Sequence, residues 1–139
     1  MNCTTYPLNS LGTYKYVVIL SCYDGKLLLS RHKERDTWET QGGHIEPGET
    51  PFEAAERELY EESGAKIYHL MPLCDYWAGD ESTKEEGNGM LFTAVIHELA
   101  PLPQSEIAEV RTFDRLPDNL TYPTITPILF AQTASRQIS

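Results

Sequence analysis

The chain has 139 residues, of which 40% are hydrophobic and 23% are charged, and its formal net charge at pH 7 is −10. This size and composition are typical of one soluble globular domain, and we interpret residues 1–139 as such a domain. The negative charge argues against non-specific nucleic-acid binding, and no apolar run approaches the roughly 18 residues that a membrane-spanning helix needs.

The cysteines, Cys3, Cys22 and Cys74, are odd in number and match no metal-ligand spacing. This usage favours a reducing compartment over a disulfide framework. The N-terminus also lacks the basic stretch and apolar core of a secretory signal. We therefore expect a cytoplasmic protein with no membrane or nucleic-acid partner.

The first part of the chain predicts a β-hairpin followed by irregular structure. The apolar runs 13–22 and 26–31 flank the turn sequence "YDG", as in a hairpin. After a polar break, residues 37–40 predict a short strand. Gly42 and Gly43 then predict a flexible loop that leads into "HIEPGE".

A helix over residues 51–63 is the strongest structural signal. Thr50 is suited to the N-cap, Pro51 to the first helical position, and Glu53 completes a capping box. Gly64 supplies the left-handed residue that ends a helix.

The remaining elements alternate between apolar and polar stretches. In chain order we expect a strand at 65–78, a polar loop at 79–89, strands at 90–99 and 107–113, and a short helix around 126–133. Strands that surround two helices in this order indicate an α/β or α+β sandwich.

The predicted helix carries an acidic strip. In a projection of about 100° per residue, Glu58, Glu61 and Glu62 share one strip, and the small Ala54 lies within it, leaving room for a ligand. An apolar stripe runs directly beside this strip, formed by Phe52, Ala55 and Leu59.

The acidic strip breaks two local rules of helix stability. Like charges three and four positions apart cost about 0.2–0.5 kcal/mol per pair, and acids in the last turn oppose the helix dipole. Arg57 can pair with Glu61 but offsets only part of this cost. A bound divalent cation would make every one of these interactions favourable. A solvated, glutamate-rich helix face is the alternative interpretation.

A longer pattern of glycines, acids and one arginine contains this strip. Its positions are Gly43, Glu49, Arg57, Glu58, Leu59, Glu61, Glu62, Gly64 and the small apolar Ala65. The pattern resembles the signature box of the Nudix hydrolases. Two positions depart from the family's preference, since Ala65 replaces a bulkier aliphatic residue and Gln41 stands where a proline often precedes the glycines. Both departures bear on packing and loop stiffness and not on chemistry.

The resemblance implies an α/β/α sandwich with a mixed central sheet. It also implies hydrolysis of the pyrophosphate linkage in a nucleoside diphosphate derivative, such as a nucleoside triphosphate, with Mg²⁺ or alternatively Mn²⁺ as cofactor. By position in the box, the metal ligands would be Glu58, Glu61 and Glu62, with Glu49 and the Gly42 carbonyl as auxiliary ligands. Arg57 would orient these glutamates.

Further site residues follow from the chemistry of such a reaction. A carboxylate must accept a proton from the attacking water, and the candidates are Glu58 and Glu106. Arg31, at the end of the second predicted strand and aimed toward the loop at Gly43, is our choice of phosphate-binding cation.

The group attached to the phosphates also needs a binding surface. Tyr76 and Trp77 end a predicted strand and are candidates for stacking a nucleobase, with a place in the core as the alternative. His44 is better suited to a structural role, because Mg²⁺ prefers oxygen ligands. Glu85 and Glu86 fit a solvated charge run, with a second option that they approach the site.

Two other functions are compatible with the same residues. A non-catalytic nucleotide sensor on this fold would bind nucleotides without turnover, and an acidic interaction module would not respond to Mg²⁺. The sequence leaves open which nucleotide is the substrate, how many metal ions bind and whether the protein is a homodimer.

Overall fold

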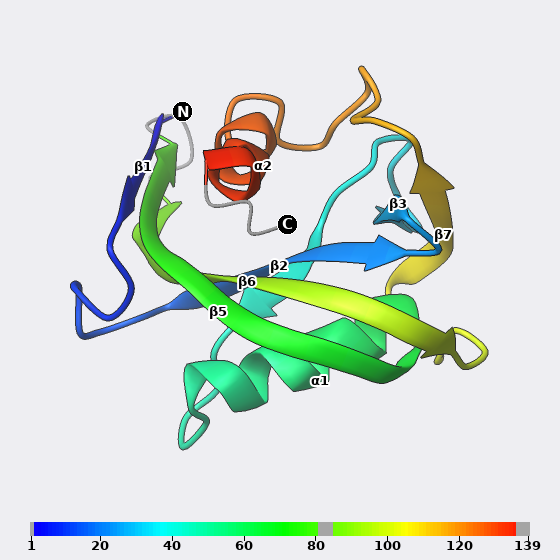
Figure 1. The fold of residues 1–139 in the computed structure, drawn as a ribbon, viewed down its shortest axis with the longest axis horizontal. Helices are drawn as coiled ribbons and strands as arrows, with labels where there is room; N and C mark the ends of the chain where they lie inside the picture. Colours follow the sequence, from blue (N-terminus) through cyan, green and yellow to red (C-terminus); the bar gives the residue numbers. More distant parts are fainter. Residues whose placement is uncertain (1, 81–84, 136–139) are drawn as a thin grey trace.

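The computed structural model describes residues 2–80 and 85–135 (Figure 1). Its elements in chain order are β1 (Asn2–Tyr6), β2 (Tyr16–Tyr23), β3 (Lys26–His32), β4 (Gln41–His44), α1 (Pro51–Ser63), β5 (Ala65–Asp80), β6 (Glu85–Leu99), β7 (Ile107–Phe113) and α2 (Thr126–Ser135). None of the helices in these ranges is long and apolar enough to cross a lipid bilayer.

The strands form one mixed sheet between the two helices. The strand order is β1-β5-β6-β2-β3-β7, and β4 pairs with β2 beside this path. The central pair, β2 and β6, is parallel, and the other pairs are antiparallel. Helix α1 lies on one face of the sheet and α2 on the other (Figure 1). This arrangement confirms the expected α/β/α sandwich.

Each helix packs on its own apolar core. On the α1 face, Ala55 and Leu59 pack with Phe92 and Ile96 of β6, and all four are buried. On the α2 face, Leu129 packs in a second cluster of buried residues that includes Leu20, Cys74, Tyr76 and Leu91. Because β2, β5 and β6 contribute side chains to both clusters, the sheet is covered on both faces over its centre.

Helix α1 has the boundaries that the sequence predicts, because both ends are fixed by local interactions. The Thr50 hydroxyl accepts a hydrogen bond from the Glu53 amide at 3.1 Å, and the Glu53 carboxylate accepts one from the Thr50 amide at 2.9 Å. Gly64 ends the helix with φ +78°, and a Cβ there would lie 2.6 Å from the Ala100 carbonyl oxygen. Only glycine fits this conformation and this contact.

Several sequence predictions for other elements are wrong in detail. Residues 37–40 make only isolated bridges, Ser30 with Glu39 and Trp38 with Leu120, and form no strand. Gly42 and Gly43, predicted as a flexible loop, lie in β4. The predicted polar loop 79–89 is shorter than expected, because β5 and β6 pair as far as Asp80 and Glu85.

Strand β2 has two partners on the same edge, and this arrangement creates a fork. Residues 16–19 pair with β4, whereas residues 21–23 pair with β3. At the fork lies Gln41, whose side chain is fully buried. Its oxygen accepts from the Ser21 hydroxyl at 2.6 Å, and its nitrogen donates to the Leu28 carbonyl at 3.1 Å and to the Ser30 hydroxyl at 2.9 Å. Gln41 thus links β2 to β3 where the strands diverge, and its own buried polar atoms are satisfied.

The same network reaches the end of helix α1. The Ser30 hydroxyl donates a hydrogen bond to the Glu62 carbonyl at 2.7 Å. Strands β2, β3 and β4 are therefore connected to the last turn of α1 through side chains. A proline at position 41 would remove the amide that makes these bonds, so the network gives a physical role to this departure from the family pattern.

We predict that Gln41→Met lowers the free energy of unfolding by about 2–3 kcal/mol, because it removes three buried hydrogen bonds, including the one that the Ser21 hydroxyl donates. Urea denaturation followed by circular dichroism measures this change. Gln104→Met, at an exposed position before β7, serves as the control and should have little effect. Equal stability of the two variants would contradict the assigned role of Gln41.

Candidate active site

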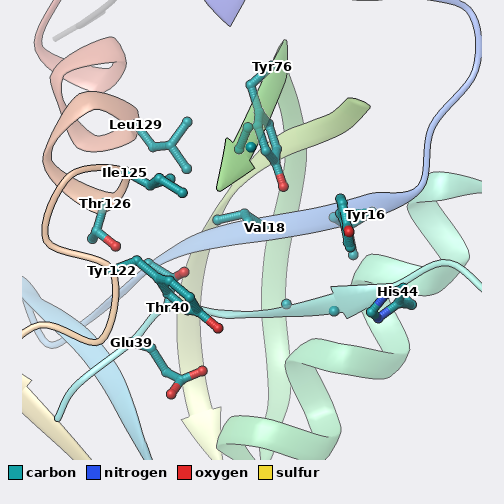
Figure 2. A pocket seen from close by; sticks show the side chains of 15 residues that line it. Tyr16, Val18, Glu39, Thr40, His44, Tyr76, Tyr122, Ile125, Thr126 and Leu129 are labelled. Atoms are coloured by element: carbon teal, nitrogen blue, oxygen red, sulfur yellow. The ribbon is translucent and has the colours of Figure 1, made fainter. Parts of the chain in front are cut away.

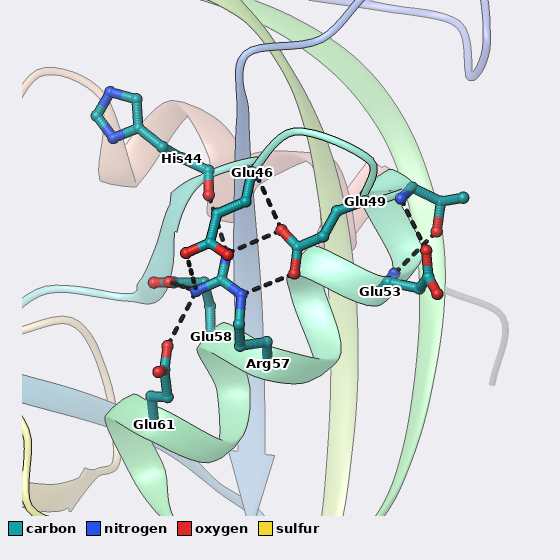
Figure 3. A network of polar contacts seen from close by, with 8 residues as sticks. His44, Glu46, Glu49, Glu53, Arg57, Glu58 and Glu61 are labelled. Carbon is teal, nitrogen blue, oxygen red and sulfur yellow. Dashed lines mark hydrogen bonds and ion pairs between the residues drawn. The ribbon is translucent and has the colours of Figure 1, made fainter.

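Arg57 lies at the centre of the acidic residues of the box (Figure 3). Its Nε and Nη2 donate to the two carboxylate oxygens of Glu49 at 2.7 and 3.0 Å, a bidentate contact. Its Nη1 donates to Glu58 at 2.5 Å and to Glu61 at 3.0 Å, and Nη2 also reaches the His44 carbonyl at 3.1 Å. One guanidinium thus holds three carboxylates and the end of β4 in place.

This arrangement shifts the acidity of the groups involved. Hydrogen bonds from Arg57 and from the Glu46 amide lower the pKa of Glu49 to about 2. The Glu49 contacts likewise raise the pKa of Arg57 above its ordinary value. For Glu58, burial raises the pKa and outweighs the opposing effect of Arg57. Arg57 and Glu49 are therefore an ion pair at neutral pH, whereas Glu58 accepts a proton more readily than an ordinary glutamate.

Glu62 lies deeper than the other acids of the strip. Its Oε1 accepts a hydrogen bond from the Gly42 amide at 2.8 Å. Burial, with smaller contributions from the negative charges of Glu58, Glu39 and Glu61, raises its pKa to about 8, although the Gly42 amide opposes this shift. Without a nearby cation, the ionised form of Glu62 is therefore unfavourable in the folded protein.

The glycines of β4 allow close contact with these acids. A Cβ on Gly43 would lie 2.5 Å from Oε2 of Glu58, and one on Gly42 would overlap the Val17 carbonyl oxygen. Any other residue at position 43 would displace the Glu58 carboxylate. In contrast, the expected room beside Ala54 is absent, because Ala54 is fully buried in the core on the α1 face.

The donor chemistry of this cluster fits a hard divalent cation. Carboxylate oxygens are the ligands that Mg²⁺ and Mn²⁺ prefer, and Glu58, Glu61 and Glu62 lie close together near the end of α1. Among the described residues, no three acidic, histidine or cysteine side chains already converge as metal ligands. Two of the expected ligands, Glu58 and Glu61, accept hydrogen bonds from Arg57 through Oε1, and Arg57 makes no hydrogen bond to Oε2 of either carboxylate within the described residues.

A cavity lies on the other side of β4 (Figure 2). Its volume is about 450 Å³, within the usual range for a small-molecule site. Gly42 and Gly43 form part of its lining, and Tyr16 and Val18 of β2 lie beside them. Helix α2 and the segment before it close the cavity with Tyr122, Ile125, Thr126 and Leu129. The two glycines are therefore shared between the cavity and the acidic cluster.

The box residues predicted from the sequence lie close together in the structure. Some of the predicted site residues outside the box lie elsewhere. Tyr76 lines the cavity, whereas Trp77 does not, because neighbouring residues of a strand point to opposite faces. Arg31 contacts Glu109 at 3.4 Å and the Arg35 carbonyl at 3.2 Å.

Within the described residues, the side chains of Glu106 and Glu86 make no hydrogen bond or ion pair with the box. Glu106 is highly exposed and reaches His32 at 3.2 Å. The backbone of Glu86 pairs in the β5–β6 ribbon, and the side chain of Glu85 lies outside the described residues. The roles suggested for Arg31 and Glu106 stay predictions.

Sequence reasoning missed most of the residues that line the cavity. The alternation of Tyr16 and Val18 with the buried Val17 and Ile19 was a usable signal, since it indicates that β2 has two occupied faces. Nothing in the local sequence of Thr126 indicates that α2 packs against the same region. That pairing depends on contacts between segments far apart in the chain.

Comparison with known proteins identifies a family model that matches most of the chain. The model described as the NUDIX domain matches residues 13–127. The match begins before β2 and ends at the start of α2, so it includes the acidic cluster and nearly all of the cavity lining.

Individual related proteins match shorter parts of the chain. The candidate 8-oxo-dGTP diphosphatase YtkD of Bacillus subtilis is 42% identical over 62 residues, which cover 45% of this chain and 39% of that protein. An RNA pyrophosphohydrolase of Psychrobacter is 37% identical over 62 residues, covering 43% of this chain and 36% of the relative. These matches span about two fifths of the relatives' own length.

A solved structure matches almost the whole chain. It is the Bacillus subtilis pyrophosphohydrolase BsRppH, in a variant with one glutamate replaced by alanine, which superposes with a TM-score of 0.78 at 26% identity. The match covers 97% of this chain and 91% of that one.

We predict that Gly43→Ala weakens Mn²⁺ binding by about 10-fold, because the added methyl group displaces the Glu58 carboxylate. Isothermal titration calorimetry measures the affinity. Gly87→Ala is the matched control, since its methyl group would meet the side chains of Lys15 and Tyr16, away from the acidic cluster. Equal Mn²⁺ affinity of both variants and the wild type would contradict the role of Gly43.

The raised pKa of Glu62 makes the stability of the metal-free protein depend on pH. Because the folded-state pKa of Glu62 is about 8 and its ordinary value is 4.5, the folded chain holds a proton that the unfolded chain has lost between these values. This contribution to stability is fully present below pH 4.5 and is lost as the pH rises through 8.

We therefore expect Glu62→Gln to stabilise the metal-free protein at pH 8 by about 2 kcal/mol and to change little near pH 4.5. Thermal denaturation in the presence of a chelator, measured from pH 4.5 to 8.5, gives the comparison. Glu49 acts in a separate window, since its lowered pKa gives stability above pH 4.5 that is lost as the pH falls toward 2. If the stabilities of the wild type and Glu62→Gln change with pH in parallel, the raised pKa of Glu62 is contradicted.

Proposed function

This chain belongs to the NUDIX domain family, and on that premise we propose that it is a metal-dependent hydrolase that cleaves the pyrophosphate linkage of a nucleoside diphosphate derivative. One observation supports this proposal most directly. Gly42 contacts Glu62 and Gly43 lies against Glu58, and both glycines also line the cavity, so a ligand in the cavity is next to the acidic cluster.

The metal ligands that we propose are Glu58, Glu61 and Glu62, with Glu49 and the Gly42 carbonyl as auxiliary ligands. A bound Mg²⁺ or Mn²⁺ would neutralise phosphate charge and lower the pKa of a coordinated water. Glu62 is fixed for this role by the Gly42 amide, and Ser30 fixes the last turn of α1 through the Glu62 carbonyl. Both contacts limit the movement of the helix end that carries the acids.

Glu58 is our choice for the group that accepts the proton of the attacking water. Its carboxylate lies against Gly43, and Arg57 restricts its orientation. Its raised pKa makes it a stronger base than an ordinary glutamate, as a proton acceptor at neutral pH requires. The carboxylate of Glu106, the other candidate, makes a polar contact with His32 at 3.2 Å and none with the box residues among those described.

The cavity is the proposed site for the nucleoside portion of the substrate. Its volume suits a nucleobase, and its walls combine aromatic, aliphatic and hydroxyl side chains. The formal charge of −10 favours a free nucleotide over a long nucleic acid. We therefore propose a nucleoside triphosphate or a related nucleotide as the substrate, and a nucleoside monophosphate as one product.

We expect Glu61→Gln to lower kcat at least 100-fold with little change in stability, because Glu61 is half exposed and contributes only to the cluster. The assay combines Mg²⁺ or Mn²⁺ with a nucleotide panel and with a short 5′-triphosphorylated RNA, and identifies the products. Glu56→Gln, whose partner is the Tyr68 hydroxyl, is the control on the same helix and should retain activity.

Full activity in Glu61→Gln would refute the metal-ligand assignment. Nucleotide-induced thermal stabilisation without turnover across the panel would favour a non-catalytic sensor. Preferred cleavage of the RNA would contradict the choice of a free nucleotide.

A further inference from the structure

Tyr76 is a buried residue whose hydroxyl has no hydrogen-bond partner among the described residues. The residue is 3% exposed and lies in β5 opposite Gly89 of β6. A Cβ on Gly89 would overlap the ring and hydroxyl of Tyr76, so glycine is required for the ring to occupy this position. The ring is thus held by the strand beneath it, while its polar end is unused within the described part of the protein.

The Tyr76 hydroxyl is directed into the cavity (Figure 2). Within the described part of the chain, no side-chain oxygen or nitrogen that is sealed from solvent lacks a partner. The Tyr76 hydroxyl makes no hydrogen bond within the described residues and is not among such sealed groups, so its oxygen is open to the cavity into which it points. Buried polar groups are normally satisfied, so this hydroxyl is suited to a ligand.

Thr126, on the opposite wall of the cavity, is a second buried residue with an unused hydroxyl. It is also 3% exposed, lines the cavity at the start of α2, and its hydroxyl makes no hydrogen bond within the described residues. The two hydroxyls come from β5 and α2, which are separated by about fifty residues of chain. Two independent elements therefore present unused hydroxyls to one cavity.

The charge of the cavity restricts what these hydroxyls can bind. The charged carboxylate among its lining residues, Glu39, is paired with Arg35 at 3.0 Å. Burial raises the pKa of Tyr76 well above its ordinary value, with the Cys3 thiol and Tyr16 adding to the shift. The Tyr76 hydroxyl therefore stays neutral and protonated over the whole physiological range, and it can both donate and accept a hydrogen bond.

We propose that the hydroxyls of Tyr76 and Thr126 bind the polar edge of an uncharged heterocyclic base and so determine which nucleotide the protein accepts. This inference rests on the proposed function for the identity of the reaction. Base binding itself is measured without turnover, so that the two proposals can fail separately. The aliphatic side chains of Val18, Ile125 and Leu129 would contact the faces and apolar edge of the same base.

The test uses Tyr76→Phe and Thr126→Val in the full chain. We expect each substitution to raise KM for the preferred nucleoside triphosphate about 5- to 10-fold with little change in kcat, because a base atom loses its partner. Hydrolysis of inorganic tripolyphosphate, which has no base, should be unchanged. Thr126→Ser keeps the hydroxyl and should restore the wild-type KM.

Calorimetric binding of nucleoside monophosphates gives a readout that does not require turnover. We expect the affinity for the preferred monophosphate to fall by the same factor in Tyr76→Phe. A 5′-monophosphorylated oligonucleotide in the same assay distinguishes a free nucleotide from the 5′ end of RNA as the source of the base.

Tyr68→Phe is the matched control, since its hydroxyl bonds to Glu56 on the α1 face, away from the cavity. It should leave nucleotide binding unchanged. The melting temperature separates a ligand role from a structural role, because removing a hydroxyl without a protein partner should leave stability equal or higher in Tyr76→Phe.

Unchanged nucleotide affinity in Tyr76→Phe and Thr126→Val would overturn the inference. An equal loss of activity toward nucleotides and tripolyphosphate would overturn it too, because the hydroxyls would then not act on the base. If the wild type binds monophosphates but hydrolyses nothing, the proposed function fails. The monophosphate affinities of the variants relative to the wild type still decide the role of the two hydroxyls.

Discussion

The structure of the site depends on one electrostatic constraint, which is the repulsion among carboxylates on the last two turns of α1. Arg57 offsets it by contacting Glu49, Glu58 and Glu61 at 2.5 to 3.0 Å. Within the described residues Arg57 makes no hydrogen bond or ion pair with Glu62, which lies deepest in the strip and accepts a hydrogen bond from the Gly42 amide. The protein therefore neutralises only part of the negative charge of the cluster, and a bound divalent cation would neutralise the rest.

The backbone around the cluster is fixed more firmly than the glycines alone would allow. Gly42 and Gly43 must lack side chains, because Val17 and Glu58 occupy the space where a Cβ would lie. Such a sequence would be flexible by itself, yet Gln41 holds it as a strand through three buried hydrogen bonds. Small residues thus permit the close contacts, and a buried amide supplies the rigidity that the glycines cannot.

The sequence was most informative where structure is determined by neighbouring residues. Helix α1, its caps and its acidic strip follow from spacing within one segment, and they are confirmed. The cavity was not predictable in this way, because Tyr76 and Thr126 line one cavity only after α2 packs on the sheet that contains β5. Alternation along β5 could have shown that Tyr76 and Trp77 cannot both face one ligand. Strand β4 was missed because its pairing with β2 overrides the low strand propensity of glycine.

The parallel pairing of β2 with β6 has a consequence for how the chain folds. It joins Tyr16–Tyr23 to residues 89–96, and the whole segment with the acidic helix lies in the loop that this pairing closes. Closing so long a loop before its contacts form carries a large entropic cost, which is typical of slow-folding, non-local topologies. The acidic helix can form early from its caps, because its interactions are local, whereas the parallel pairing of β2 with β6 joins distant segments of the chain.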